Sequence, residues 1–157
     1  MHQVGLRSHY VASVYAAPLL LESKGLIANI SSFGGASYQV NVAYGVGKAG
    51  VDRLASDMAH ELAPHGVCCV SLYPGIVRTE RVLAGELPFP TDNSESPELT
   101  GRAIAALFAD TKRMEKTGRT LVVAELAEDY DFTDVDGTRP ASLRQTSRKK
   151  KSAEDSP

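Results

Sequence analysis

Three short apolar runs, each bounded by turn residues, most constrain what this 157-residue chain can fold into. They cover residues 26–30, 67–73 and 120–124. Continuous rather than alternating apolar runs indicate strands that are buried on both faces, as in a parallel sheet. Because segments with helical periodicity precede and separate these runs, the order predicts crossover units and an α/β fold.

The segments between the strands predict three helices. The first covers residues 4–21 and is bent or ended near Pro18, because proline has no N–H to donate within a helix. The second covers residues 44–63, with apolar residues at helical spacing, and Pro64 and Gly66 close it. The third follows Ser96, a candidate N-cap. Residues 78–96 have no clear period and predict a long loop with a helical turn near Val82.

Residues 1–140 are predicted to form one partial domain, and residues 141–157 a polar tail. The tail ends in a basic run at residues 148–151, followed by an acidic stub. Because this segment has too few apolar residues to form a core, we expect it to be disordered.

Composition excludes several classes of function. The net charge of −2 is too small to indicate a nucleic-acid partner. No stretch reaches the roughly 20 apolar residues of a transmembrane helix. The start of the chain does not resemble an export signal, so we expect a cytoplasmic protein with Cys68 and Cys69 reduced and buried. His60 and His65 lack the spacing of a helical metal-binding pair, and no metal site is expected.

The residues that carry chemistry are Ser31 and Ser32 after the first strand, and Tyr44 and Lys48 at the start of the second helix. Tyr44 and Lys48 are four residues apart and share a helix face. A lysine ammonium about 4 Å from a tyrosine favours the phenolate by up to about 4 kcal/mol at an effective dielectric near 20. Such a tyrosine can protonate a carbonyl oxygen as hydride arrives at the carbon, and Ser32 can hold that oxygen by a hydrogen bond.

A Tyr-x-x-x-Lys pair alone is a weak signal, because most such pairs are ordinary surface neighbours. Here two further motifs accompany it in order. Asn-Ile-Ser-Ser ends the first strand at residues 29–32, and Pro-Gly-Ile-Val-Arg-Thr follows the second at residues 74–79. The carboxyl ends of parallel strands are where open α/β sheets bind ligands. Together the three motifs favour one functional edge.

In this combination the motifs resemble those of the classical short-chain dehydrogenase/reductase family, over residues 4–137. The resemblance implies the C-terminal part of a Rossmann-like doubly wound parallel sheet, with three strands and crossover helices. It implies an oxidoreductase that transfers hydride between NADP(H) or NAD(H), with NADP(H) favoured, and a carbonyl or hydroxyl substrate, such as a steroid- or xenobiotic-like ketone. It also allows endoplasmic-reticulum association.

The resemblance assigns roles to individual residues. Tyr44 would be the general acid/base, Lys48 would assist it and hold the nicotinamide ribose, and Ser32 rather than Ser31 would position the carbonyl. A further set would line the nicotinamide and diphosphate: Pro74, Gly75, Ile76 and Thr79. The loop over residues 78–96 would correspond to the variable substrate lid.

Two departures from the family pattern affect these expectations. His2 stands where the family places an asparagine that takes part in proton relay, a role that histidine can also fill. The glycine-rich turn that receives the pyrophosphate does not occur in this chain, so we expect the nucleotide-binding half to be missing and the first strand to leave an apolar sheet edge. This loss leaves open that the chain is inactive.

A second hypothesis is therefore a non-catalytic remnant that acts as an interaction module. The helices predicted over residues 4–21 and 44–63 resemble the pair through which family members dimerise. The partner would be a second copy of the chain or a full-length relative.

Overall fold

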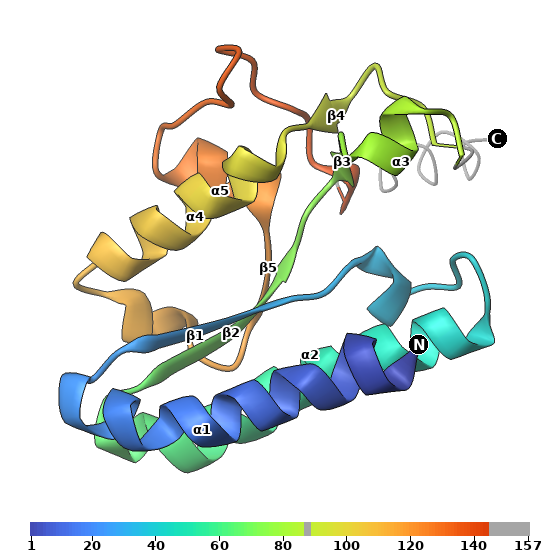
Figure 1. Ribbon diagram of the computed structural model, residues 1–157. Helices are drawn as coiled ribbons and strands as arrows, with labels where there is room; N and C mark the ends of the chain where they lie inside the picture. Colours follow the sequence, from blue (N-terminus) through green and yellow to red (C-terminus); the bar gives the residue numbers. More distant parts are fainter. Residues whose placement is uncertain (87–88, 145–157) are drawn as a thin grey trace, which may run out of the picture. The chain divides into compact units, whose positions relative to one another are not determined.

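The computed structural model describes residues 1–86 and 89–144 (Figure 1). Its elements, in chain order, are η1 (Gln3–Arg7), α1 (Ser8–Ser23), β1 (Leu26–Ile30), η2 (Phe33–Gly35), α2 (Val42–Leu62), η3 (Ala63–His65), β2 (Cys68–Tyr73), β3 (Ile76–Val77), α3 (Glu80–Leu83), β4 (Ser94–Glu95), α4 (Pro97–Ala109), η4 (Arg113–Lys116), β5 (Thr120–Val122) and α5 (Val123–Asp129). They form two compact units. The first comprises Met1–Tyr73 and Ile104–Leu121, and the second comprises Pro74–Ala103 and the described residues from Val122 onward.

The first unit is built on a parallel pair of strands. β1 pairs with β2 in a register that runs from Leu26 opposite Cys68 to Ile30 opposite Leu72. The three-stranded sheet has the order β1-β2-β5. All six residues of β2 are buried, as expected for a central strand. The prediction of an α/β fold with a parallel sheet is confirmed.

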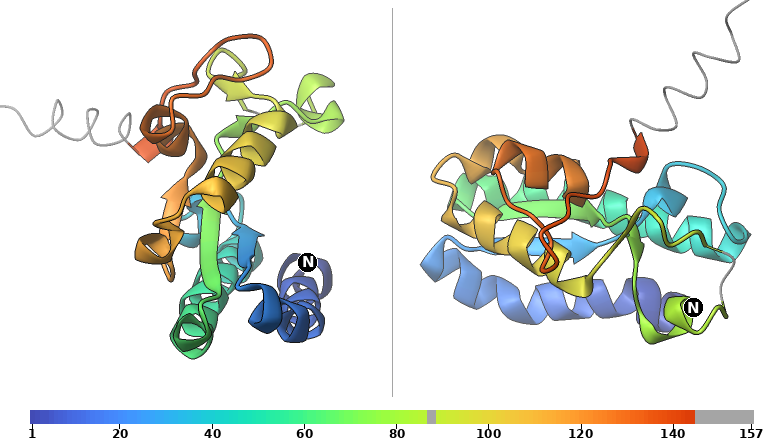
Figure 2. Two further views of the ribbon diagram at one scale, coloured as in Figure 1. Left: turned by 90° about the vertical axis from the view of Figure 1, so that its left-hand side faces the viewer. Right: turned by 90° about the horizontal axis from the view of Figure 1, so that it is seen from above.

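α1 and α2 lie beside each other on one face of this strand pair (Figure 2). α2 presents small residues to the strands, with Val51, Ala55 and Ala59 buried at intervals of one helical turn. It begins two residues before the predicted start because the side chain of Asn41 accepts a hydrogen bond from the N–H of Tyr44 (2.9 Å) and caps the helix. The start of α2 lies beside the loop that follows β1 (Figure 1).

α1 continues through Pro18 to Ser23, so of the two predicted alternatives, a bend or an end near Pro18, the end is wrong. Another predicted boundary is also wrong. The third strand ends at Val122 instead of residue 124, and a missed helix, α5, follows. A short buried apolar run cannot be assigned to strand or helix from periodicity alone.

The second unit contains a small parallel strand pair, of which only β4 lies inside the predicted loop. β3 pairs with β4, with Ile76 opposite Ser94 and Val77 opposite Glu95. The predicted helical turn near Val82 is α3. Residues 78–96 therefore hold regular structure at both ends. α3 is formed by local hydrogen bonds, such as that from the N–H of Leu83 to the carbonyl of Thr79, whereas β4 pairs with β3, which is distant in sequence.

The described residues continue to residue 144, four positions past the predicted boundary at residue 140. Ser142 is buried, and its hydroxyl donates a hydrogen bond to Glu125 (2.7 Å). Arg144 forms an ion pair with the same carboxylate at 3.0 Å. The rest of the predicted tail, including the basic run, lies outside the described residues. Among the residues that the structure describes, no helix is both long and apolar enough to cross a membrane.

Candidate active site

The two serines after β1 have different surroundings. Ser31 is buried, and its hydroxyl donates to the backbone carbonyl of Lys48 (3.1 Å). Ser32 accepts a hydrogen bond from the N–H of Gly34 at its Oγ (3.1 Å), which caps η2. Ser31 therefore ties β1 to α2, whereas Ser32 keeps a hydroxyl proton for another acceptor.

Tyr44 lies in the first turn of α2, directly opposite Ser32. Its hydroxyl donates to Oγ of Ser32 at 2.8 Å. A side chain on Gly34 would collide with the Tyr44 ring, because a Cβ there would lie 2.5 Å from ring atom Cε1. The phenol of Tyr44 and the hydroxyl of Ser32 thus lie in direct contact with each other.

Lys48 follows Tyr44 by one helical turn, and its ammonium lies 5.9 Å from the centre of the tyrosine ring. Its Nζ donates to the carbonyl of Ile30 (3.2 Å) at the end of β1. Burial lowers the pKa of Lys48, and the carboxylate of Asp52 acts in the opposite direction. The structure therefore brings together the three side chains named as catalytic candidates.

Sequence reasoning missed two polar residues near Lys48, Asp52 and His9. Asp52, four residues after Lys48, accepts hydrogen bonds from Ser71 (2.6 Å) and Tyr73 (2.5 Å) on β2. Burial, and then the charge of Lys48, lower the pKa of His9, while the carbonyl of Ile30 raises it. Asp52 could have been found in the sequence, because residues four apart, such as Lys48 and Asp52, share a helix face.

A small cavity of about 90 Å³ adjoins the candidate residues, lined by Met1, His2, Gly5, Tyr44, Gly47 and Lys48. Nε2 of His2 lies 2.8 Å from the carbonyl oxygen of Ala43. The imidazole, at the position where the resemblance places an asparagine, is thus held beside Tyr44 and Lys48.

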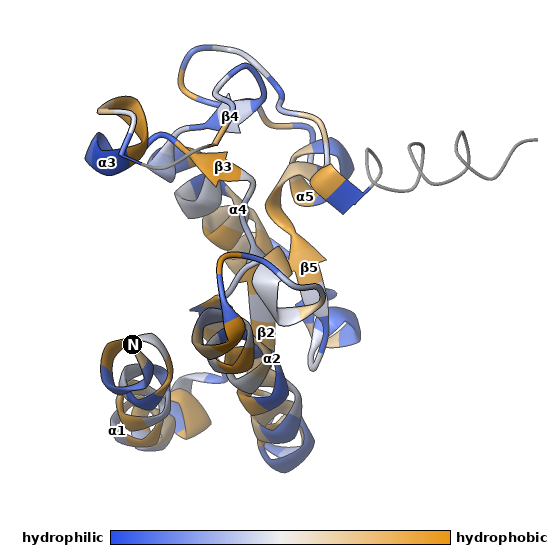
Figure 3. Cartoon of the chain, turned by 90° about the vertical axis from the view of Figure 1, so that its right-hand side faces the viewer, coloured by the Kyte–Doolittle hydropathy of each residue, from blue (hydrophilic) through white to orange (hydrophobic). Residues whose placement is uncertain are grey.

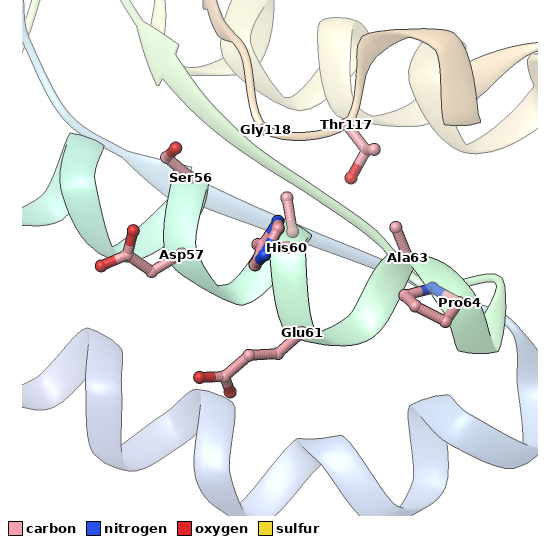
Figure 4. Close-up of a pocket in the computed structure, with 9 residues that line it drawn as sticks. Ser56, Asp57, His60, Glu61, Ala63, Pro64, Thr117 and Gly118 are labelled. Carbon is pink, nitrogen blue, oxygen red and sulfur yellow. The ribbon is translucent and has the colours of Figure 1, made fainter.

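A wider hollow of about 800 Å³ lies over the C-terminal half of α2 and the Thr117–Gly118 turn (Figure 4). Figure 4 shows that the side chains of Asp57, His60 and Glu61 point in different directions. Asp57 is already paired with Arg53. No group of three or more metal-ligating side chains occurs among the described residues. The hollow therefore lacks a converging set of functional groups.

The second unit holds the turn that the resemblance links to the nucleotide. The N–H of Gly75 donates to the side chain of Glu95 (2.9 Å), Ile76 begins β3, and Thr79 precedes α3. Glu95 has no exposed surface, and burial is the main cause that raises its pKa to about 7. Sequence reasoning missed Glu95, because nothing in its neighbourhood marks a buried acid.

The motifs and this geometry agree with a comparison against known protein families. The family model for short chain dehydrogenases matches residues 1–84. The chain belongs to the short-chain dehydrogenase family. Ser32, Tyr44 and Lys48 all lie within the matched segment.

Relatives from this family extend the match along the chain. Dehydrogenase/reductase SDR family member 1 from Mus musculus is 44% identical over 151 residues, covering 87% of this chain and 48% of that protein. The Homo sapiens protein of the same name is 45% identical with the same coverage. The chain thus spans about half the length of the curated relatives it matches.

Two solved structures share the fold. A 4-hydroxyisoleucine dehydrogenase complexed with NADH and succinate is 28% identical, with a TM-score of 0.62, over 76% of this chain and 53% of that one. ElxO with NADP bound is 24% identical with a TM-score of 0.63, over 76% and 53%. The second likeness shows the fold alone.

The residues present suit one part of a nicotinamide nucleotide. Tyr44 and Lys48 place a hydroxyl and an ammonium on adjacent turns beside a cavity, a donor set that matches a ribose diol. Lys48 Nζ makes one hydrogen bond to Ile30, which leaves donors for a ligand. These residues therefore fit the nicotinamide ribose.

Proposed function

We propose that this chain carries the proton donor and the carbonyl-binding hydroxyl of an NAD(P)-dependent carbonyl reduction. The observation that supports this most strongly is the 2.8 Å hydrogen bond between the hydroxyls of Tyr44 and Ser32. An incoming carbonyl oxygen replaces that bond and accepts one hydrogen bond from each hydroxyl.

The chain's own residues perform the proton chemistry. Ser32 donates to the carbonyl oxygen and orients it, and Tyr44 transfers its proton to the same oxygen as negative charge develops there. Lys48 stabilises the phenolate that remains, because its ammonium lies on the next turn. When bound, a reduced nicotinamide nucleotide supplies the hydride.

The nucleotide contacts are proposed residue by residue from the family resemblance. Tyr44 and Lys48 hold the nicotinamide ribose, and a second set contacts the nicotinamide and diphosphate: Pro74, Gly75, Ile76 and Thr79. NADP(H) is the proposed nucleotide in preference to NAD(H), and a steroid- or xenobiotic-like ketone the proposed substrate class. Both preferences rest on resemblance, since related structures contain either nucleotide.

The test is oxidation of NADPH by the purified chain, followed by the loss of nicotinamide absorbance with a panel of ketones and aldehydes. We expect oxidation only when nucleotide and carbonyl are both present, and faster with NADPH than with NADH. The proposal is contradicted if no carbonyl compound increases oxidation of either nucleotide above the rate without protein.

A second candidate function is that of a non-catalytic interaction module, which associates through α1 and α2 with a second copy of the chain or a full-length relative. α1 exposes large apolar side chains, including Tyr15 (80% exposed), Leu19 (70%) and Val14 (50%). Figure 3 shows that hydrophobic and hydrophilic residues alternate along α1. Exposed apolar patches on a helix favour a protein partner. Replacing Tyr15 and Leu19 with glutamate should convert the associated species to monomer in sedimentation, and an unchanged distribution would reject this candidate.

A further inference from the structure

Glu95 is a fully buried carboxyl group in a fixed stretch of backbone. Its exposed fraction is 0%, and it lies on β4 opposite Val77 of β3. The N–H of Arg78 donates to the carbonyl of Glu95 at 2.8 Å, which holds the backbone on that side. The side chain therefore projects from a rigid position.

One carboxylate oxygen of Glu95 accepts a hydrogen bond from the turn after β2. Oε2 accepts the N–H of Gly75 at 2.9 Å. A Cβ at position 75 would lie 2.8 Å from this oxygen, so a larger residue there would displace the carboxylate of Glu95. The contact joins two residues that are twenty positions apart and sets the orientation of the Gly75 peptide.

The other oxygen of Glu95 is unsatisfied. Among the described residues, neither Oε1 of Glu95 nor the hydroxyl of Thr100 has a hydrogen-bond partner, although the two are close enough for Thr100 to lower the pKa of Glu95. Unpaired buried polar atoms are rare and call for an explanation. The charged groups that act on Glu95 are Asp134, which raises its pKa, and Arg78, which lowers it. Arg78 is itself paired with Asp134 and Asp136.

A glutamine at this position would be the less costly choice for stability. It has nearly the same size, can accept the Gly75 N–H and can donate to Thr100, without a buried charge. Local features that reduce stability are concentrated at functional sites. The turn that Glu95 holds is the one assigned to the nucleotide under the proposed function.

We propose that Glu95 is a positioning residue that fixes the Pro74–Gly75–Ile76 backbone for nicotinamide nucleotide binding by accepting the N–H of Gly75. This inference rests on the proposed function and adds a residue to it. A charged acceptor binds an N–H more strongly than a neutral one. Burial raises the pKa of Glu95 to about 7, so its carboxylate is protonated as the pH falls through neutrality. Protonation weakens the hydrogen bond from the N–H of Gly75, and the affinity for the nucleotide falls as a result.

The direct test is NMR titration of the Gly75 amide in the whole chain, together with nucleotide affinity. In the wild-type chain the Gly75 amide signal should follow one transition near pH 7. Glu95→Gln should remove that transition and bind NADPH at every pH with the weaker affinity that the wild-type chain shows below pH 7, because its acceptor is neutral. Glu95→Leu, which has no acceptor, should raise the dissociation constant for NADPH at pH 8 about tenfold.

Glu98→Gln is the matched control, because Glu98 is an exposed glutamate in the first turn of α4 and should leave the Gly75 transition in place. The inference is overturned if the Gly75 amide does not titrate, or if Glu95→Leu, with a folded spectrum, binds NADPH as tightly as wild type. The amide titration does not depend on turnover. If the chain shows the Gly75 transition but neither binds nor oxidises NADPH, both the proposed function and the nucleotide role of Glu95 are refuted. If the chain oxidises NADPH but does not show the transition, only the role of Glu95 is refuted.

Discussion

Tyr44→Phe lowers kcat for carbonyl-dependent NADPH oxidation by about a thousandfold, within the range of a lost general acid. The substitution removes one oxygen atom, and with it the proton that a carbonyl oxygen must receive. It also frees Oγ of Ser32, which remains bonded to Gly34 and stays in position. The effect should therefore appear in kcat, with binding of the nucleotide changed only slightly.

Tyr10→Phe serves as the control for Tyr44→Phe. Tyr10 is 57% exposed on α1 and has no role in the proposed chemistry, so this variant should retain wild-type kcat. Steady-state rates and circular dichroism of both variants make the comparison. Turnover by Tyr44→Phe within about twofold of wild type would remove Tyr44 from the mechanism.

Glu95→Gln raises the free energy of unfolding above pH 7 by about 3 kcal/mol. Burial raises the pKa of Glu95 from 4.5 to about 7, and each tenfold change in proton affinity corresponds to about 1.4 kcal/mol. Below pH 4.5 the carboxyl is protonated in both the folded and the unfolded chain, so the charge carries no penalty there. As the pH rises from 4.5 to 7, the free energy of unfolding of the wild-type chain falls, and above pH 7 the cost of burying the charge is constant. The glutamine variant lacks this loss.

Urea denaturation of the wild-type chain and the Glu95→Gln variant at pH 5 and pH 8 measures this difference. The gap between the two proteins should be clearly larger at pH 8 than at pH 5, and Glu98→Gln should show no such pH dependence. An equal gap at both pH values would mean that charge burial at Glu95 has no effect on stability.

The strand pair and the long helix were predictable because their signals are local. The apolar run at β1 and the periodicity of α2 each lie within one segment, and the pairing of Tyr44 with Ser32 followed from placing one at a helix start and the other at a strand end. Helical spacing alone put Tyr44 and Lys48 on one face. The candidate catalytic residues could thus be chosen before the structure was known.

Features that depend on distant contacts could not be predicted. The pairing of β3 with β4 and the Glu95–Gly75 contact join residues separated by a loop with no periodic pattern. α5 was assigned to the preceding strand because Val123 and Ala124 continue its apolar run. Burial of Glu95 is set by the surrounding tertiary structure, and its sequence neighbours are polar.

The most direct test of the proposed carbonyl reduction follows a labelled hydride from the nucleotide to the alcohol product. The chain would be incubated with a ketone and NADPH carrying deuterium at the transferable position of nicotinamide C4, and the alcohol product analysed by NMR. The wild-type chain should form an alcohol with deuterium at the former carbonyl carbon, and Tyr44→Phe should form about a thousandfold less of this labelled alcohol in the same time. An alcohol without deuterium at that carbon, or equal amounts of labelled alcohol from both proteins, would contradict the proposed mechanism.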